Sequence, residues 1–516
     1  MAACTLPRCL RSLLVFALVL ASGCASLRSS VPRLPSYTIA QSDQTTLGRA
    51  FAAQADEHPG QSGFQVVPGA QSAFASRAAL VDAAERTLDL QSFSVGDDLT
   101  SDLLLQRIVA AADRGVRVRI LLDDVHPTTR VFAQRAAAAG INVRLFNPFF
   151  FGGTHSVSRL VEFLFDPQRL NRRMHNKLWV TDNAAAVVGS RNLGDEYFGA
   201  HEAANFNDVD LLVIGPIVQE LSAAFDTYWN SAAAVPLEAL VAPDAAEGAW
   251  VRERLRARLQ ACSGAPPCTW LAQGGLVDAL RSGGIALSWA PARAIYDHPD
   301  LDKSGSEGGA DDHRPSGAPT RSELLIVSPY FIPDERERRH LAEMVQRGVR
   351  VAVLTNSLAS TDSPAAHAAY ARYRIELLRS GVELYEARPE PGTSHRPSHR
   401  WGRASPSSLH AKLVVQDRTH ALVGSLNRDP RSRLHNTEAC IAVEGAELAG
   451  DLAALFDEAS EPHHAFRLEL AASGRDVEWT TDEDGRTARY VDEPFAGVWL
   501  LLWRSTLGAL IPEHQL

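Results

Sequence analysis

The 516-residue chain contains two copies of one long pattern, and this internal repeat restricts what the chain can fold into. An upstream stretch, 112–124, reappears as 345–357. Farther along, six residues recur at a constant offset of 235: His175, Lys177, Asp182, Gly189, Ser190 and Asn192 match His410, Lys412, Asp417, Gly424, Ser425 and Asn427. Two copies of this length are too few for a solenoid, so we expect a duplicated globular protein built from two similar halves.

Each half has the same order of expected elements. Strand-like stretches at 87–95 and 323–333 are rich in apolar residues, and a helical pattern follows each of them. The order strand, helix, strand, helix, strand, strand predicts an α/β fold with a mainly parallel sheet covered by helices. We therefore expect two tandem α/β domains related by a pseudo-twofold axis.

The boundaries of these domains follow from changes in composition along the chain. The expected parts are a signal peptide at 1–24, an N-terminal arm at 25–70, the first domain at 71–235, a connecting region at 236–296 with an amphipathic helix at 251–261, a flexible insertion at 297–321, the second domain at 322–490, and a C-terminal segment at 491–516. An irregular basic stretch at 388–408 leads into the second histidine, and it is compatible with a phosphate-holding loop or with a solvated surface loop.

Lysine is rare in this chain, and its positions indicate a site. Only three of the 51 basic residues are lysines. Two of them, Lys177 and Lys412, occupy equivalent positions of the repeat, and the third, Lys303, lies in a linker rich in Gly, Ser and Asp. Lysine is a compact charge with three freely aimed donors, whereas arginine is a broad planar fork. The repeated position therefore requires the smaller cation.

The repeated residues place complementary groups at one sheet edge. Residues i and i+2 of a strand share a face, so each His-x-Lys sets an imidazole beside an ammonium group. The next strand adds a hydroxyl and an amide from Ser190 and Asn192, or from Ser425 and Asn427. A lone His-x-Lys is more often a surface strand with a stray histidine, but two copies in register favour a site shared by the two halves.

Such a shared pocket suits a phosphodiester. Two ammonium groups and two asparagine amides can neutralise the phosphoryl oxygens without a metal ion. One imidazole can attack phosphorus while the other protonates the leaving alkoxide.

The repeated motif resembles the HxKxxxxD signature of the phospholipase D superfamily, which stands here as His175/Lys177/Asp182 and His410/Lys412/Asp417. The resemblance implies two tandem αβα sandwich domains with one shared active site, and a reaction through a phosphohistidine that uses no metal and no cofactor. It also implies that His175 is the nucleophile. His410 would act as the general acid, and then as the base that deprotonates the incoming alcohol.

Several stretches, "RLNRRMHNK", "GSRNLGDEYFGA", "LLDDV", "HPGQSGF" and "RDPRS", resemble the bacterial cardiolipin synthase C branch over nearly all of 40–516. This resemblance implies a phosphatidyl transfer that forms cardiolipin from phosphatidylglycerol and a second phospholipid, with phosphatidylethanolamine as a further candidate substrate. The alternatives are a phospholipase D hydrolase that releases phosphatidic acid, a nuclease, and a non-catalytic lipid-binding lipoprotein. The intact double motif argues against the last, and the net charge of −10 argues against a nucleic-acid partner. The hydrolase stays open.

Each histidine also needs a partner at its second ring nitrogen. Alignment of 207–215 with 437–445 sets Asp208 against Glu438, and both positions resemble the histidine-orienting carboxylates of the superfamily. With these carboxylates available, we expect Asp182 and Asp417 to form structural salt bridges, although a role as proton carriers is the alternative.

The N-terminus has the features of a lipoprotein signal. Arg8 and Arg11 precede a short apolar run that ends in "ASGC" at Cys24, the residue expected to carry lipid. An uncleaved membrane helix is the alternative, but the run is short for a span. We expect a membrane-anchored lipoprotein facing the periplasm, and Ala25 after the cysteine favours the outer membrane.

The cysteines of the later part of the chain suggest one disulfide and one core position. Cys262 and Cys268 could form a disulfide in an oxidising periplasm, while Cys440 lies in an apolar strand pattern and is expected in the core. Neither the spacing nor the neighbours of these cysteines suggest a metal site.

The apolar stretch 495–511, with two tryptophans, is predicted to lie at a membrane interface, and a buried core helix is the alternative.

Overall fold

The computed structural model describes residues 31–150, 155–202, 204–242, 245–262, 264, 266–272, 275–300, 303, 314–389 and 407–497. The expected signal peptide with Cys24, most of the basic stretch 388–408, residues 301–302 and 304–313 of the insertion, and residues 498–516 of the C-terminal segment lie outside this description. Among the described residues, no helix is both long and apolar enough to cross a bilayer.

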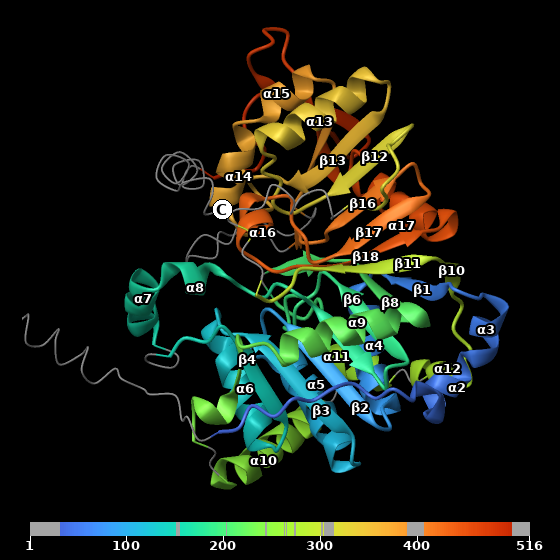
Figure 1. The fold of residues 1–516 in the computed structure, drawn as a ribbon. Coiled ribbons are helices and arrows are strands. Elements are labelled where there is room, and N and C mark those ends of the chain that lie inside the picture. The colour runs from blue at the N-terminus through green and yellow to red at the C-terminus, as the bar shows by residue number, and fades with distance from the viewer. Residues whose placement is uncertain are drawn as a thin grey trace, which may run out of the picture.

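Two large sheets form the body of the protein, one for each half of the repeat (Figure 1). The first sheet has the strand order β10 (Ser288–Ala290), β1 (Ser62–Val67), β8 (Asp210–Ile214), β6 (Ala185–Gly189), β5 (Leu178–Thr181), β2 (Thr87–Ser92), β3 (Arg117–Asp123), β4 (Asn142–Phe146) and β9 (Ala234–Pro236). The second has the order β11 (Ala292–Tyr296), β18 (Ala439–Glu444), β17 (His420–Gly424), β16 (Leu413–Gln416), β12 (Glu323–Val327), β13 (Arg350–Asn356), β14 (Glu383–Ala387), β19 (Ala465–Leu470), β20 (Val477–Glu483) and β21 (Arg486–Tyr490).

Helices cover both faces of the sheets, as an α/β fold requires. One apolar core lies between the first sheet and its outer helices, α4 (Ala70–Ala83), α5 (Leu99–Asp113), α6 (Pro127–Ala138), α10 (Ala245–Ala261), α11 (Pro266–Ala272) and α12 (Leu276–Ser282). A central core joins the two sheets through α9 (Pro216–Trp229) and α17 (Ala446–Ala459). A third lies under α13 (Glu335–Gln346), α14 (Pro364–Ala371) and α15 (Arg374–Arg379). The α/β class and the paired arrangement of the halves are thereby confirmed.

The expectation of a mainly parallel sheet is wrong. Only β2, β3 and β4, and their counterparts β12, β13 and β14, pair in parallel, while the remaining pairs in both sheets are antiparallel. One reason is the tight turn after each motif strand, where Asp182 and Asn183 have φ of 55° and 52°, and Asp417 and Arg418 both have φ of 53°. Two successive left-handed residues form the turn of a hairpin, so the next strand runs back beside the first.

The region expected to connect the halves contributes a strand to each sheet. Strand β10 pairs with β1 in the first sheet, and β11 begins two residues later and pairs with β18 in the second. Strand β1, from the expected N-terminal arm, lies inside the first sheet between β10 and β8. The expected helix at 251–261 is the later part of α10. Cys262 and Cys268 form the disulfide between α10 and α11, and Cys440 is buried in β18.

Candidate active site

The two motif histidines lie where the halves of the chain pair with each other. Strand β15 (Ser407–Leu409), just before His410, runs parallel to β7 (Asn205–Asn207), just before Asp208. In the same way, Met174 forms a parallel bridge with Thr437, which precedes Glu438. The amide N–H of His175 donates to Thr437 O at 2.9 Å, and that of His410 donates to Asn207 O at 2.8 Å. Each histidine is therefore held beside the carboxylate of the other half.

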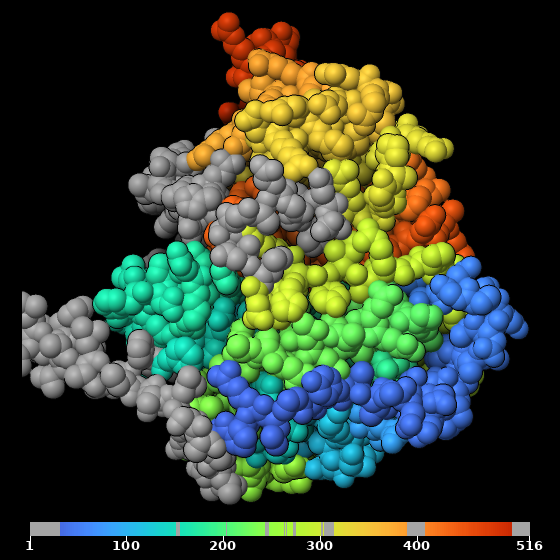
Figure 2. Space-filling model, viewed as in Figure 1, coloured from blue at the N-terminus to red at the C-terminus, as the bar shows by residue number. Residues whose placement is uncertain are grey.

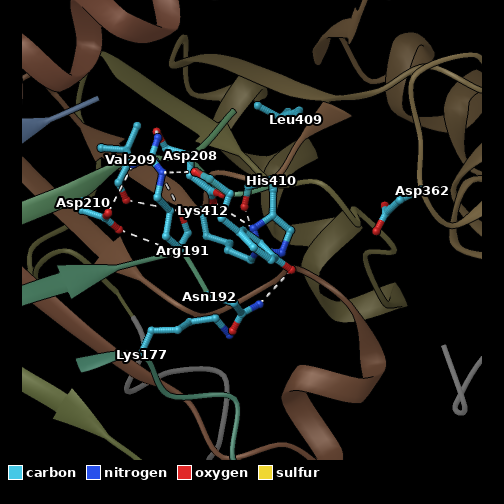
Figure 3. Close-up of polar contacts among 12 residues, drawn as sticks. Lys177, Arg191, Asn192, Asp208, Val209, Asp210, Asp362, Leu409, His410 and Lys412 are labelled. Carbon is cyan, nitrogen blue, oxygen red and sulfur yellow. Dashed lines mark hydrogen bonds and ion pairs between the residues drawn. The ribbon is translucent and has the colours of Figure 1, made fainter. Parts of the chain in front are cut away.

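The carboxylates are exchanged between the halves. Nδ1 of His175 lies 2.9 and 3.1 Å from the two carboxylate oxygens of Glu438. Nδ1 of His410 lies 2.8 Å from Oδ1 of Asp208, a contact that Figure 3 shows. All four side chains are buried. A neutral imidazole that donates Nδ1–H to a carboxylate keeps its lone pair on Nε2, which is the form needed for attack or for accepting a proton.

The two lysines are buried beside the histidines. Each ammonium group donates to the carbonyl oxygen of the histidine two residues earlier, Lys177 to His175 and Lys412 to His410, both at 2.6 Å. Figure 3 shows both lysines in the neighbourhood of His410. Each ammonium group retains further N–H donors, so the two lysines form a cationic site.

Burial and charge lower the pKa of the cationic groups. Burial lowers the pKa of His175 to about 4, against the attraction of Glu438, and Lys177 and Lys412 act in the same direction as burial. Burial also lowers the pKa of His410 below its usual value, lowers that of Lys412 to about 8, and lowers that of Lys177 well below its usual value. Although burial opposes the ionisation of Glu438, contact with His175 and Lys177 lowers its pKa to about 2. The site therefore favours neutral imidazoles beside ionised carboxylates.

The serines expected to bind phosphate lie behind the carboxylates instead. Ser425 donates its hydroxyl proton to Glu438, which also accepts from Ser432 Oγ at 2.8 Å. Ser190 donates to Val209 O at 3.2 Å. A hydroxyl has a single proton to donate, so Ser425 positions the carboxylate of Glu438, and Ser190 positions the backbone beside Asp208, rather than a phosphate.

The two carboxylates differ in how firmly they are held. Glu438 accepts from His175, Ser425 and Ser432. Asp208 accepts from His410 through Oδ1, and among the described residues its buried Oδ2 has no hydrogen-bond partner. The pairing of each histidine with a carboxylate of the other half is thus symmetric, but Glu438 accepts more hydrogen bonds than Asp208.

The two asparagines remain close to the site. Nδ2 of Asn192 donates to the hydroxyl of Tyr197 at 3.0 Å, and its Oδ1 accepts from Ser94 N at 3.3 Å. Asn427 is buried, and its Oδ1 has no hydrogen-bond partner among the described residues. An amide nitrogen carries two hydrogens, so Asn192 keeps one N–H for a phosphoryl oxygen.

Among the described residues, the motif aspartates form no salt bridge, contrary to expectation, and instead accept hydrogen bonds from backbone amides. Asp182 accepts from the amides of Glu85, Arg86 and Thr87 at 2.8–2.9 Å, where β2 begins. Asp417 accepts in the same way at the start of β12, from the amides of residues 321–323 at 2.7–2.9 Å. The two aspartates were expected within the catalytic motif, but their contacts are structural. Each joins the hairpin turn to the start of the neighbouring strand.

Aromatic rings that the sequence did not single out pack against both histidines. Phe93 lies edge-on to His175 with ring centroids 5.0 Å apart, and its ring is 5.2 Å from Nζ of Lys177. Phe206 and Tyr197 lie 5.0 and 5.5 Å from the ring of His410. These rings limit the rotation of the imidazoles.

The third lysine also lies under the site, although it was expected in a flexible insertion. Nζ of Lys303 lies 2.6 Å from Oδ2 of Asp297 and donates to the carbonyls of Ser432 and Asn436 at 3.1 and 2.8 Å. The same oxygen of Asp297 accepts from the amide of Glu438 at 2.8 Å. Lys303 and Asp297 are therefore buried supports of the carboxylate that contacts His175, and the rarity of lysine was the signal for this role.

Among the described residues, one cluster has the spacing of a metal site, formed by His367, Glu386 and Glu493. The guanidinium of Arg374 lies among these side chains, 2.6 Å from an oxygen of each glutamate and 2.7 Å from Nε2 of His367. This cation already occupies the position that an ion would take, so the cluster is a buried ionic network.

Known proteins resemble the chain over most of its length. The family model described as "Cardiolipin synthase, PLD-like domain" matches residues 78–229 and 318–459. Cardiolipin synthase C of Escherichia coli (strain K12) is 36% identical over 475 residues, which cover 88% of this chain and 96% of that protein. Cardiolipin synthase A of Pseudomonas aeruginosa (strain LESB58) is 25% identical over 392 residues, which cover 75% of this chain and 64% of that protein.

A solved structure has a similar fold. The crystal structure of phosphatidylserine synthase from Haemophilus influenzae Rd KW20 superposes with a TM-score of 0.55 at 14% identity, over 88% of this chain and 95% of that one. At this identity the likeness concerns the arrangement of the two sheets and their helices.

Proposed function

The chain belongs to the cardiolipin synthase family of the phospholipase D superfamily and is a phosphatidyltransferase, and we propose that it forms cardiolipin from phosphatidylglycerol and a second phospholipid. The observation that carries the proposal is the exchange of carboxylates, His175 with Glu438 and His410 with Asp208. This exchange supports one reaction centre that uses both halves.

In the first half-reaction, Nε2 of His175 attacks phosphorus of the first phosphatidylglycerol, and the P–O bond to the glycerol headgroup breaks. His410, protonated when the anionic substrate binds, gives its Nε2 proton to the leaving oxygen. Lys177 and Lys412 neutralise the non-bridging oxygens, whose charge is greatest in the transition state. Glu438 stabilises the cationic phosphohistidine that results.

In the second half-reaction, His410 accepts the proton of the incoming hydroxyl, and that oxygen attacks phosphorus. The P–N bond to His175 breaks, so both histidines return to their starting state. A headgroup hydroxyl of phosphatidylglycerol gives cardiolipin, whereas water gives phosphatidic acid. Either acceptor satisfies the chemistry of the side chains, and the family resemblance favours the lipid.

One experiment separates transfer from hydrolysis. The purified protein is incubated with phosphatidylglycerol, with and without phosphatidylethanolamine, and the products are identified by mass spectrometry. Cardiolipin supports the proposal, and a higher yield with phosphatidylethanolamine identifies it as a second substrate. Phosphatidic acid as the sole lipid product overturns the proposal in favour of the hydrolase.

The proposal extends to the location of the protein. The signal pattern that ends at Cys24 supports a lipid-anchored protein at the periplasmic side of a membrane, with the outer membrane favoured by Ala25. The mass of the mature N-terminal peptide tests it, because acylation adds a fatty-acid mass to Cys24. A Cys24→Ser variant is expected to lose that mass and to leave the membrane fraction.

A further inference from the structure

Helix α7 (Ser156–Phe165) turns its apolar side to the solvent and its charged side to the protein. Four of its six large apolar side chains are strongly exposed, Val157 by 76%, Leu160 by 59%, Leu164 by 70% and Phe165 by 69%, and the other two are partly buried. Residues three or four positions apart share a helix face, so these side chains form one continuous surface. Figure 2 shows this part of the chain as a lobe at the left of the molecule, and Figure 1 shows α7 within it.

The buried face of α7 is the charged one. Arg159 and Glu162 are exposed by only 6% and 2%, although arginine and glutamate are rarely buried without partners. A surface helix of a water-soluble protein has the opposite orientation. The apolar side chains of α7 therefore face outward because the charged face of the helix packs on the protein, and not because a core is poorly packed.

Ion pairs fix this orientation. Nη2 of Arg159 lies 2.9 Å from Oδ1 of Asp124 and donates to the carbonyl of Asp124 at 2.7 Å. Oε1 of Glu162 lies 2.7 Å from Arg169 and accepts from Phe150 N at 3.0 Å. Rotation of the helix would cover the apolar side chains but break these buried pairs, which is costly. The apolar face consequently stays outward.

The same contacts connect α7 with the candidate active site. The carboxylate of Asp123, the neighbour of Asp124, accepts from the amide of Met174 at 2.9 Å, and Met174 precedes His175. On the same loop, the exposed ring of His126 lies 5.3 Å from Phe93, which packs on His175. The helix that carries the apolar face is thus joined, through Asp124 and Asp123, to the backbone next to His175.

We propose that the outward face of α7 inserts into the surface of the lipid bilayer that supplies the substrate. The inference rests on the proposed function, since it takes the substrate to be a phospholipid. Apolar side chains on one face of a short helix bind at the level of the headgroups and upper acyl chains. A helix of ten residues is too short to span a bilayer, so it lies in the plane of the interface.

A lipid bilayer on the apolar face of α7 would assist the reaction, whereas the other groups that could cover this face would not. The acyl chains of a phospholipid must stay in an apolar phase while its phosphate reaches His175 and Lys177. A helix beside the site that enters the interface shortens the path of the phosphate out of the bilayer. A second copy of the chain, or residues 498–516 of the same chain, would cover the helix without this benefit.

The first test measures insertion without measuring activity. Full-length Leu164→Trp is mixed with phosphatidylglycerol vesicles whose acyl chains carry bromine at a shallow or at a deep position, and the added fluorescence over the parent protein is recorded. Leu259→Trp, on α10 and 40% exposed, is the matched control. Shallow bromine is expected to quench the added fluorescence of Leu164→Trp and to leave that of Leu259→Trp unchanged. Equal or absent quenching of both variants overturns the proposal.

The second test uses turnover. Leu160→Glu/Leu164→Glu is expected to transfer vesicle phosphatidylglycerol about tenfold more slowly, while its rate with monomeric short-chain phosphatidylglycerol is unchanged. Leu259→Glu should match the parent on both substrates. Equal loss on both substrates overturns the proposal, and so does a change in sedimentation without quenching, which indicates a second copy on α7.

The two tests separate this inference from the proposed function. If the fluorescence added by Leu164→Trp is quenched in a protein that yields no transfer product, the lipid-binding face stands and the proposed reaction is wrong. If transfer proceeds on vesicles but that fluorescence is not quenched, the reaction stands and the inference about α7 is wrong.

Discussion

Nδ1 of His175 lies 2.9 Å from Oε2 of Glu438, so the histidine of one half of the chain is held by a carboxylate of the other half. The reciprocal contact joins His410 to Asp208 at 2.8 Å. Two short parallel pairings, β7 with β15 and Met174 with Thr437, position both contacts. The reaction centre is therefore a product of the interface between the halves.

The first prediction concerns the two histidines. His175→Asn is expected to abolish turnover and the acid-labile phosphoenzyme, because the amide cannot take its place as nucleophile. His410→Asn is expected to form the phosphoenzyme only from a substrate whose leaving group needs no proton, such as a p-nitrophenyl ester. Rapid acid quench with a substrate labelled at phosphorus measures both. His463→Asn, at a largely exposed position, is the control. A phosphoenzyme in His175→Asn would refute the assignment.

The second prediction concerns the exchanged carboxylates. Glu438→Gln should slow formation of the phosphoenzyme on His175, and Asp208→Asn should slow the proton transfers of His410, each by roughly 10²–10⁴-fold. A p-nitrophenyl leaving group should restore phosphoenzyme formation in Asp208→Asn and not in Glu438→Gln. Glu444→Gln, an exposed carboxylate at the end of β18, should behave as the parent. Full phosphoenzyme formation in Glu438→Gln contradicts the pairing.

The third prediction concerns pH. Attack requires neutral His175, whose pKa burial lowers to about 4, so kcat/KM should fall only as the pH drops through about 4. Binding of the phosphate requires the ammonium form of Lys412, whose pKa burial lowers to about 8, and of Lys177, whose pKa is also lowered. The value should fall as the pH rises past the lowered pKa of His410, which must be protonated to act as the general acid, and fall further through about 8 as Lys412 loses its proton.

Substitution by arginine tests the origin of the alkaline limb. Lys412→Arg retains its charge, so the part of the alkaline fall near pH 8 that belongs to Lys412 should disappear and the slope there should decrease by one proton. The rate at neutral pH should be lower as well, because the planar guanidinium does not fit a site built for a compact cation. If the alkaline slope of Lys412→Arg equals that of the parent, the titration belongs to another group.

The fourth prediction concerns Lys303. Lys303→Met retains an unbranched apolar stem but removes the ammonium group that pairs with buried Asp297, and this is expected to cost about 3–5 kcal/mol of unfolding free energy. It should also reduce phosphoenzyme formation, because Asp297 accepts from the amide of Glu438. Denaturant unfolding and rapid quench well below the melting temperature measure the two effects. Adding Asp297→Asn should recover part of the stability, and an unaltered stability of Lys303→Met counts against the buried pair.

The fifth prediction concerns the motif aspartates. Asp182→Ala leaves three backbone amides without an acceptor in a buried turn, which is expected to cost about 3 kcal/mol or more. Asp417→Ala should cost less, because water can reach its half-buried turn. Urea unfolding measures the difference. If either protein keeps its stability but loses all turnover, the aspartate has a chemical role rather than a structural one.

The residues of the repeated site could be predicted from the sequence, whereas the strand pairing around the site could not. The alignment placed Asp208 and Glu438 at equivalent positions, but it could not say which histidine each would contact. That choice depends on pairing between strands more than 200 residues apart, such as β7 and β15, for which the local pattern has no signal. Strand alternation likewise put Ser190 and Ser425 near the site, but it could not show that their acceptors are a backbone carbonyl and a carboxylate rather than a phosphate.

Two misjudged features had signals in the sequence. The dipeptide Asp182–Asn183 favours two left-handed residues and therefore a hairpin, which is the step that makes the sheet mixed. Lys303 had the same rarity as the two motif lysines, yet its Gly/Ser/Asp-rich neighbours suggested a solvated linker. In both cases a single residue type carried more information than the composition around it.

The exchange of carboxylates also bears on how such a chain can evolve. After most gene duplications one copy is released from selection and is free to drift. Here a lesion in the Asp208 region disables the imidazole encoded in the later half, and a lesion near Glu438 disables the one encoded in the earlier half. Neither half can lose its site residues while the other half stays active. We therefore expect both halves to be retained together during evolution.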